Sequence, residues 1–283
     1  MAKILIVGCG AIGYELASTL ADLGHEVVGL KRNPPTENQG KFNYFRADIT
    51  VSADLEALDT DFEHIFFIVS TDSRNENSYH DIYGTGIDNL LNKLGRSGSQ
   101  ASWIFVSSTS VYGQNQGEWV DENSITVPTK STSLKIVNAE QKLMASNPAN
   151  VVVRFSGIYG PGREYLVRMA KQTPSIQQKP PYFTNRIHQS DCVGVLVFLL
   201  EQRLAGVSLE QCYVASDDDP APLWDVITWM TEKLHCNPPS AKIADNDAGM
   251  NKRCRNDRLK KLGYNFIYPS YKNGYLELIH PVK

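Results

Sequence analysis

The stretch KILIVGCGAIGYELASTLADLG, residues 3–24, predicts a strand, a tight turn and a helix in immediate succession. Residues 3–8 form a continuous apolar run, which is typical of a strand buried on both faces. Apolar residues then recur at helical spacing from Ile12 to Leu23, and Gly24 stands where a C-terminal cap is expected. This order of elements favours a βα unit at the start of a parallel sheet.

Three glycines lie at the turn between this strand and this helix. Gly8, Gly10 and Gly13 fit the spacing GxGxxG. The first permits a tight turn, the second lets the backbone approach a pyrophosphate, and the third allows close helix–strand packing. A helix N-terminus also offers N–H donors. The backbone predicted to bind the cofactor is therefore that of Gly8, Gly10, Ala11, Ile12 and Gly13. The alternative is a tight turn that binds no ligand.

Strand-like and helical patterns alternate through the first two thirds of the chain. Further strands are predicted at 25–30, 43–49, 64–70, 102–108 and 150–156, and helices at about 80–96 and 132–146. The predicted fold is therefore α/β, a doubly wound parallel sheet (Rossmann fold) with a smaller C-terminal substrate lobe. We predict an NAD(P)-binding domain at 1–159 and a smaller lobe at 160–283, with about 186–203 returning to the first domain.

Composition and charge narrow the class of protein. The formal net charge of −3 gives no electrostatic reason to expect nucleic acid or an anionic membrane as a partner. The N-terminus lacks the pattern of a secretory leader, and the apolar run at 193–200 is too short to span a bilayer. Five cysteines without CxxC spacing indicate reduced thiols in a cytoplasmic protein and no metal site, rather than disulfides.

Two basic residues stand at the end of the second predicted strand, where an NAD site usually carries an acid. A carboxylate there would repel a 2′-phosphate, whereas Lys31 and Arg32 would attract one, so the sequence favours NADP over NAD. The alternative is that both side chains lie in solvent. Asp48 and Ile49 follow the third strand and are placed to meet the adenine edge and ring.

Four further motifs carry a resemblance to a known family. WIFVSSTSVYG (103–113) and VRFSGIYGPGR (153–163) end two strands, and NRIHQSD (185–191) and CYVASD (212–217) follow. Together they resemble the extended short-chain dehydrogenase/reductase superfamily of nucleotide-sugar epimerases and dehydratases, over nearly the whole chain. The superfamily usually carries GxxGxxG, so GxGxxG here resembles an atypical branch.

The resemblance implies roles for individual residues. Ser108 takes the place of the catalytic Ser or Thr that hydrogen-bonds the reacting substrate oxygen. The cofactor's nicotinamide end is implied to lie near Val69, Ser70, Ser107, Ser156 and Gly157. The substrate cleft is implied to include Tyr112, Arg163, His188 and Asp191. For the last three, helix capping or a structural histidine is the alternative.

The stretch PTKSTSLKIVNAE (128–140) departs from the family pattern. The resemblance implies a Tyr, a Lys four residues later and a Glu eight residues later; counting back from Glu140 gives Thr132 and Ile136 instead. The Lys normally lowers the pKa of the Tyr so that it can exchange a proton, and an aliphatic hydroxyl does not titrate near neutral pH. Two alternatives involve Lys135. A register shifted by one places Ser131 four residues before Lys135, which supplies the Lys but no phenol. In the unshifted register, Lys135 at i+3 from Thr132 could still reach the cofactor ribose.

Other proton donors remain open, namely Tyr112, Tyr159 and Tyr165. The sequence therefore supports two hypotheses. The first is an epimerase, dehydratase or reductase that transfers hydride to the carbonyl or from the hydroxyl-bearing carbon of a small polar substrate such as a nucleotide sugar. The second is a protein that binds NADP without turnover and serves as a sensor or scaffold. Related folds often dimerise through helices that flank the sheet, so a homodimer is also open.

Overall fold

The computed structural model describes residues 1–36, 40–95, 101–244 and 249–280, and the chain forms two compact units. The first unit contains 1–111, 129–153 and 193–212. The second unit contains 112–128, 154–192 and 213–283. Each unit is thus assembled from separate pieces of the chain.

The predicted α/β fold is confirmed by a seven-stranded sheet with the order β12-β7-β5-β4-β1-β2-β3. Its strands are β1 (Lys3–Val7), β2 (Glu26–Lys31), β3 (Asn43–Arg46), β4 (His64–Phe67), β5 (Ser102–Ser108), β7 (Val151–Phe155) and β12 (Cys212–Ala215). β1 pairs in parallel with both β2 and β4, so it lies between them. β2 pairs in parallel with β3, and β4 with β5.

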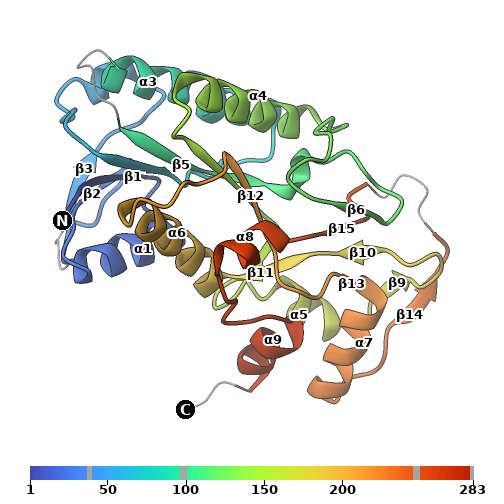
Figure 1. Ribbon diagram of the computed structural model, residues 1–283. Helices are drawn as coiled ribbons and strands as arrows, with labels where there is room; N and C mark the ends of the chain where they lie inside the picture. The colour runs from blue at the N-terminus through green and yellow to red at the C-terminus, as the bar shows by residue number, and fades with distance from the viewer. Residues whose placement is uncertain (37–39, 96–100, 245–248, 281–283) are drawn as a thin grey trace. The chain divides into compact units, whose positions relative to one another are not determined.

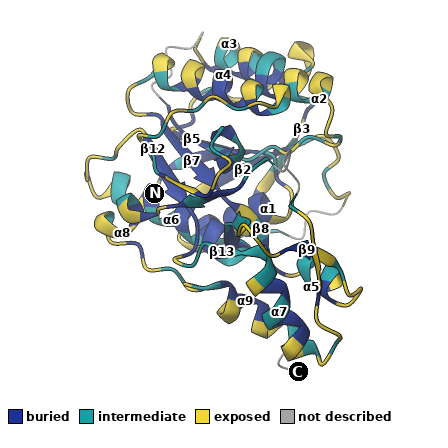
Figure 2. Cartoon of the chain, turned by 90° about the vertical axis from the view of Figure 1, so that its right-hand side faces the viewer, coloured by how far each residue is buried: buried dark blue, intermediate teal, exposed yellow. Residues whose placement is uncertain are grey.

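Helices cover both faces of this sheet in the first unit. They are α1 (Ala11–Asp22), α2 (Glu76–His80), α3 (Ile87–Gly95), α4 (Ser131–Ser146) and α6 (Gln189–Leu204), whose residues from Val193 onward belong to this unit. Figure 1 shows α3 and α4 on one face of the sheet and α1 and α6 on the other. Figure 2 shows β5 and β7 largely buried and the outer sides of α3 and α4 exposed. Continuous apolar runs are typical of strands buried on both faces, whereas the edge strand β3 has no buried residue.

The helix expected at about 80–96 is divided. A π-helical segment, η2 (Asp81–Gly86), joins α2 to α3. A Cβ atom at Gly86 would come within 2.7 Å of the Ile49 side chain, so glycine allows this segment to approach Ile49 closely. Short 3-10 turns also occur at η1 (Ser52–Leu55) and η3 (Thr109–Val111).

Within its described residues, the second unit contains short strand pairs and four helices, three of which contribute to its own core. The pairs are β6 (Glu118–Val120) with β15 (Lys252–Cys254), β8 (Gly157–Tyr159) with β11 (Arg186–His188), β9 (Ser175–Gln177) with β14 (Ser240–Lys242), and β10 (Phe183–Thr184) with β13 (Ala221–Pro222). The helices are α5 (Tyr165–Ala170), α7 (Leu223–Leu234), α8 (Asp257–Leu262) and α9 (Tyr271–Ile279). Apolar side chains of α5, α7 and α9, among them Val167, Met230 and Tyr275, form this core.

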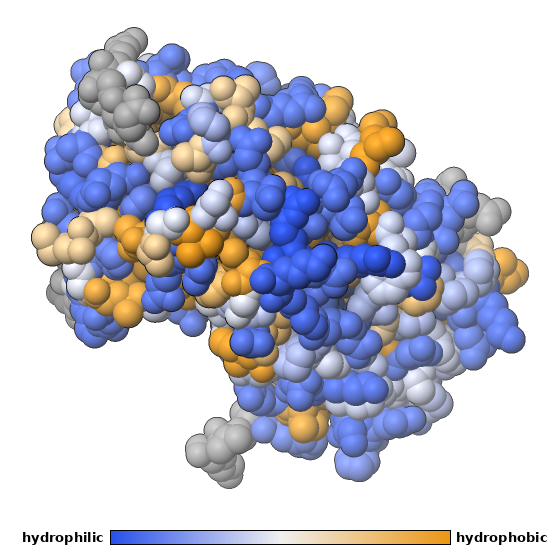
Figure 3. Space-filling model, viewed as in Figure 1, coloured by the Kyte–Doolittle hydropathy of each residue, from blue (hydrophilic) through white to orange (hydrophobic). Residues whose placement is uncertain are grey.

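Among the helices that the structure describes, none combines the length and the apolar character needed to cross a membrane. On the face shown in Figure 3, apolar residues lie in small groups separated by hydrophilic ones. Four cysteines are buried, namely Cys9, Cys192, Cys212 and Cys254, and Cys236 is partly exposed.

Candidate functional site

The glycine loop leaves space above the start of α1. Gly8 has φ +96°, and a Cβ atom there would lie 2.6 Å from the carbonyl oxygen of Ile68. Gly10 is the N-terminal cap residue, and beyond its two chain neighbours no described atom lies within 4 Å of the position its Cβ would take. The first N–H groups of a helix lack partners within it. The loop therefore offers donors and open space together, which fits a pyrophosphate.

A pocket of about 260 Å³ opens beside this loop, and all of its lining residues belong to the first unit. It brings together eight of the predicted cofactor residues: Gly8, Gly10, Lys31, Arg32, Asp48, Ile49, Val69 and Ser70. The pocket lining does not include five other predicted residues of this unit, namely Ala11, Ile12, the buried Gly13, Ser107 and Lys135. Most of the predicted cofactor site is therefore assembled in one place.

Several lining residues were not predicted, notably Cys9, Asp72 and Ile82. Cys9 follows from the motif itself, since it lies between two of the glycines. The signal for Asp72 was its position in the loop that follows β4, because the carboxyl ends of parallel strands lie at one edge of a sheet. Ile82 lies in η2, whose approach to the pocket depends on tertiary packing.

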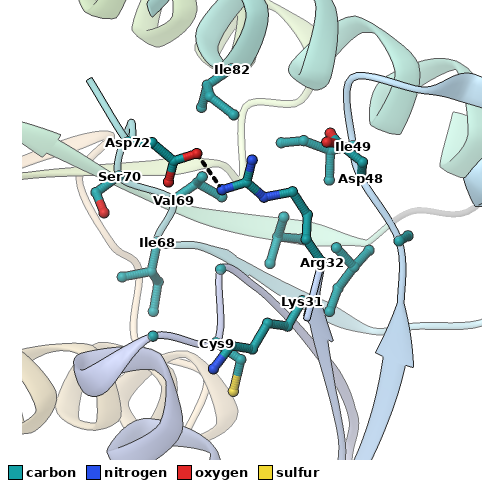
Figure 4. A pocket seen from close by; sticks show the side chains of 15 residues that line it. Cys9, Lys31, Arg32, Asp48, Ile49, Ile68, Val69, Ser70, Asp72 and Ile82 are labelled. Carbon is teal, nitrogen blue, oxygen red and sulfur yellow. Dashed lines mark hydrogen bonds and ion pairs between the residues drawn. The ribbon is translucent and has the colours of Figure 1, made fainter. Parts of the chain in front are cut away.

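Lys31 and Arg32 do not act as a pair. Arg32 extends across the pocket, and its Nη2 donates to Oδ2 of Asp72 at 2.6 Å (Figure 4). Lys31 turns instead toward Cys9 (Figure 4). Successive side chains at a strand end project to opposite sides, which explains this divergence. The hydrogen bond to Asp72 raises the pKa of Arg32, whereas burial raises the pKa of Cys9 to about 11 and nearby Lys31 opposes that rise.

Asp48 and Ile49 lie on the other side of the Arg32 side chain (Figure 4). Oδ1 of Asp48 accepts hydrogen bonds from the backbone N–H of Thr50 at 2.9 Å and from its hydroxyl at 2.7 Å. These bonds hold the carboxylate at the pocket wall. Ile49 is 4% exposed and presents an apolar surface. Contact with adenine stays a prediction for both residues.

The two serines at the end of β5 have different partners. Ser107 is buried, and its hydroxyl donates to Oε1 of Glu140 at 2.5 Å. Ser108 is half-buried, and its Oγ accepts from the backbone N–H of Ser110 at 3.1 Å. A hydroxyl that accepts one bond retains its own hydrogen for donation. Ser108 can therefore donate to a ligand oxygen, as expected of a residue that polarises it.

Glu140 fixes how α4 lies against the end of β5. Thr132, Ile136 and Glu140 are spaced by four residues and so share one face of α4. Thr132 is half-buried and Ile136 is 4% exposed. Lys135 lies off this face, and its Nζ is 3.4 Å from Oε1 of Glu76 in α2. An apolar residue thus occupies the position that counting from Glu140 assigns to the family lysine.

The three alternative tyrosines all belong to the second unit. The hydroxyl of Tyr112 donates to the carbonyl oxygen of Asp121 at 2.7 Å and accepts from Nη1 of Arg154 at 3.0 Å. Tyr159 is 2% exposed, and burial raises its pKa well above the usual value. Tyr165 is 62% exposed. The partners of Tyr112 and the burial of Tyr159 argue against proton exchange by either residue.

The other residues of the second unit that were predicted to contact the cofactor or the substrate differ in how exposed their side chains are. Ser156 is buried, and its Oγ has no hydrogen-bond partner among the described residues. Gly157 and Arg163 are exposed. His188 is buried, its ring centroid lies 4.0 Å from that of Tyr268, and burial lowers its pKa. Ser156 and Arg163 therefore have polar groups to offer a ligand, while His188 is packed among aromatic rings.

Asp191 does not cap α6, which was the alternative to a place in the substrate cleft. The helix begins at Gln189, and Asp191 lies inside its first turn. Its carboxylate accepts from the backbone N–H groups of Ile267 at 2.8 Å and Tyr268 at 3.0 Å, and from the hydroxyl of Tyr264 at 3.0 Å. Asp191 thus anchors the segment that precedes α9.

Comparison with known proteins agrees with this geometry. The model of the NAD dependent epimerase/dehydratase family matches residues 4–203. Protein YeeZ of Escherichia coli K12 is 25% identical over 277 residues, covering 95% of this chain and 97% of YeeZ. A solved structure from Methylobacillus flagellatus, named for the same family, is 34% identical with a TM-score of 0.83 and covers 98% of this chain and 97% of its own. The UDP-glucose 4-epimerase of Thermotoga maritima, solved with UDP-glucose, shares the fold at 17% identity and a TM-score of 0.79, covering 98% and 97%.

Proposed function

Because this chain belongs to the NAD dependent epimerase/dehydratase family, we propose that it binds NAD(P) in the glycine-loop pocket and transfers hydride to or from a polar substrate. The observation that carries the proposal is the open space above Gly10 at the N-terminus of α1, inside a pocket lined by eight predicted cofactor residues. When bound, the nicotinamide supplies the hydride donor or acceptor. The chain's own residues bind, orient and polarise.

The substrate of this proposal is a nucleotide sugar or a similar carbonyl or hydroxyl compound. The support is the family membership together with the shared fold of the T. maritima enzyme, whose structure contains UDP-glucose. Ser108 is the proposed catalytic residue, because its hydroxyl hydrogen is available to a substrate oxygen while Ser107 donates to Glu140. Its role would be to stabilise charge on that oxygen as hydride moves.

For the cofactor, we propose a preference for NADP that depends on Arg32. The support is its guanidinium inside the pocket, which could bind a 2′-phosphate, and the lack of a carboxylate at the end of β2. Arg32→Glu should weaken binding of NADP more than binding of NAD. Lys31→Glu makes the same change of charge on the side chain that turns toward Cys9, and it should discriminate less. Equal effects of Arg32→Glu on both nucleotides would contradict the assignment.

A second candidate function is dinucleotide binding without turnover, as in a sensor or scaffold. It is favoured by Thr132 and Ile136 on the Glu140 face of α4 and by the ion pair of Lys135 with Glu76. The occupied hydroxyl of Tyr112 points the same way. If the protein does turn over a substrate, its proton donor would have to be the substrate, water or another residue.

One experiment separates the two candidates. The purified protein is tested for bound dinucleotide, and nicotinamide absorbance is then followed with a panel of nucleotide sugars and small carbonyl compounds. Ser108→Ala should abolish turnover, whereas Ser110→Ala removes a hydroxyl two residues away and should retain most of it. Binding of NADPH without turnover of any substrate would favour the sensor, and failure to bind either nucleotide would reject both candidates.

A further inference from the structure

The Arg32–Asp72 ion pair lies inside the glycine-loop pocket, and both residues line it. Arg32 follows β2 and Asp72 comes five residues after the end of β4. Since β1 lies between these strands, their ends are separated by two strand spacings, roughly 9–10 Å. The long arginine side chain spans that gap across the pocket (Figure 4).

The surroundings of the Arg32 guanidinium are negatively charged. Asp72 accepts a hydrogen bond from it, and Asp48 also acts on it electrostatically, so two carboxylates face one cation. Lys31 turns toward Cys9 and does not add to the positive charge at this point. A 2′-phosphate that approached Arg32 would therefore meet a cation whose charge is already compensated.

We propose that Asp72 is a selectivity residue that competes with the 2′-phosphate of NADP for Arg32 and so limits the preference for NADP over NAD. The inference rests on the proposed binding of NAD(P) in this pocket, and it holds whichever nucleotide binds more tightly. Asp72 acts on the phosphate in two ways. It occupies a hydrogen-bonding position on Nη2 of Arg32, and its own negative charge repels the phosphate.

The ion pair is exposed enough to exchange partners. The side chains of Arg32 and Asp72 are 48% and 72% exposed. Exposed ion pairs are weak, so the phosphate can displace the carboxylate of Asp72 from Arg32. Breaking that ion pair costs free energy, which reduces the affinity for NADP that the phosphate gains from Arg32. NAD carries a neutral 2′-hydroxyl at the same position, and its affinity should depend little on Asp72.

The test is the dissociation constant of NADP⁺ and of NAD⁺, measured by titration calorimetry on the full chain and its variants. Asp72→Asn keeps the shape of the side chain and should tighten NADP⁺ binding by about two- to fivefold, the range expected for removing one exposed competing pair. NAD⁺ affinity should remain nearly unchanged. The control is Asp88→Asn, which makes the same change of net charge in another exposed pair, with Lys142 at 2.5 Å, and should leave the ratio of the two constants unchanged.

A second background tests whether the effect passes through Arg32. In Arg32→Gln, the further change Asp72→Asn should alter the NADP⁺ constant less than it does with Arg32 present. An undiminished effect would show simple repulsion and overturn competition for Arg32. An unchanged ratio in Asp72→Asn alone would overturn the inference and leave the proposed function standing. Failure of the unaltered protein to bind either nucleotide would reject both.

Discussion

Replacing Gly8 by alanine tests whether the glycine loop is held by the close approach of β1 to the segment after β4. A Cβ atom at Gly8 would lie 2.6 Å from the carbonyl oxygen of Ile68, 2.7 Å from its carbonyl carbon and 2.8 Å from the backbone nitrogen of Val69. All three are backbone atoms, which cannot rotate away as a side chain can. The residue also has φ +96°, a conformation that L-residues rarely adopt.

These two effects set the size of the loss. Holding an L-residue in so sparsely populated a conformation costs about 1–3 kcal/mol. Forcing a methyl group into a packed site costs about 1–3 kcal/mol more. A loss near the middle of the combined range, about 4 kcal/mol, lowers the melting temperature of a chain this size by about 8–16 °C.

Gly10→Ala is the matched comparison two residues away. Gly10 has φ −80°, and beyond its two chain neighbours no described atom lies within 4 Å of its Cβ position. Because alanine is a poorer N-terminal cap than glycine, the variant should lose about 0.5–1 kcal/mol, a few degrees at most. Its methyl group would occupy the space proposed for the pyrophosphate, so NADP⁺ and NAD⁺ should both bind at least about tenfold more weakly.

Scanning calorimetry and nucleotide titration measure the two properties on the same samples. We expect Gly8→Ala to lose mainly stability and Gly10→Ala to lose mainly affinity. A melting temperature for Gly8→Ala within about 2 °C of the unaltered protein, well under the shift calculated above, would refute the steric reasoning. Unchanged nucleotide affinity in Gly10→Ala would refute the location of the pyrophosphate.

Three further predictions concern buried groups. Ser107→Ala removes the hydrogen bond to buried Glu140 and should cost about 1–3 kcal/mol in urea unfolding. Burial raises the pKa of Asp217 well above its usual value, so the stability that this carboxyl contributes is present below about pH 4 and declines as pH rises toward the folded pKa. In urea melts, the free energy of unfolding of Asp217→Asn should therefore rise relative to that of the unaltered protein between about pH 4.5 and pH 8. A difference in unfolding free energy that does not change with pH would contradict this. A methyl group on Gly274 would lie 2.8 Å from ring carbons of buried Tyr159. Gly274→Ala should therefore lower the melting temperature, although alanine favours a helix more than glycine does. An unchanged melting temperature would show that the Tyr159 ring can shift.

Local sequence pattern was sufficient to predict the elements that carry the proposed cofactor site. The apolar run at 3–8, the glycines after it and the helical spacing from Ile12 onward correspond to β1, the glycine loop and α1. Such patterns are reliable because a strand buried on both faces must be apolar throughout and only glycine fits the φ observed at Gly8. The division of the helix at 80–96 was not predicted, since it depends on how closely Gly86 approaches Ile49.

The sequence by itself therefore determined the α/β fold, the glycine loop and several of the residues at the strand ends, although not Asp72. Only the tertiary structure decided which of those side chains meet. Ser107 contacts Glu140, which is 33 residues away, and Arg32 contacts Asp72, which is 40 residues away. The physical reason is the order of the strands: placing β1 between β2 and β4 brings the ends of β2 and β4 within reach of one arginine side chain, and no local pattern records that order.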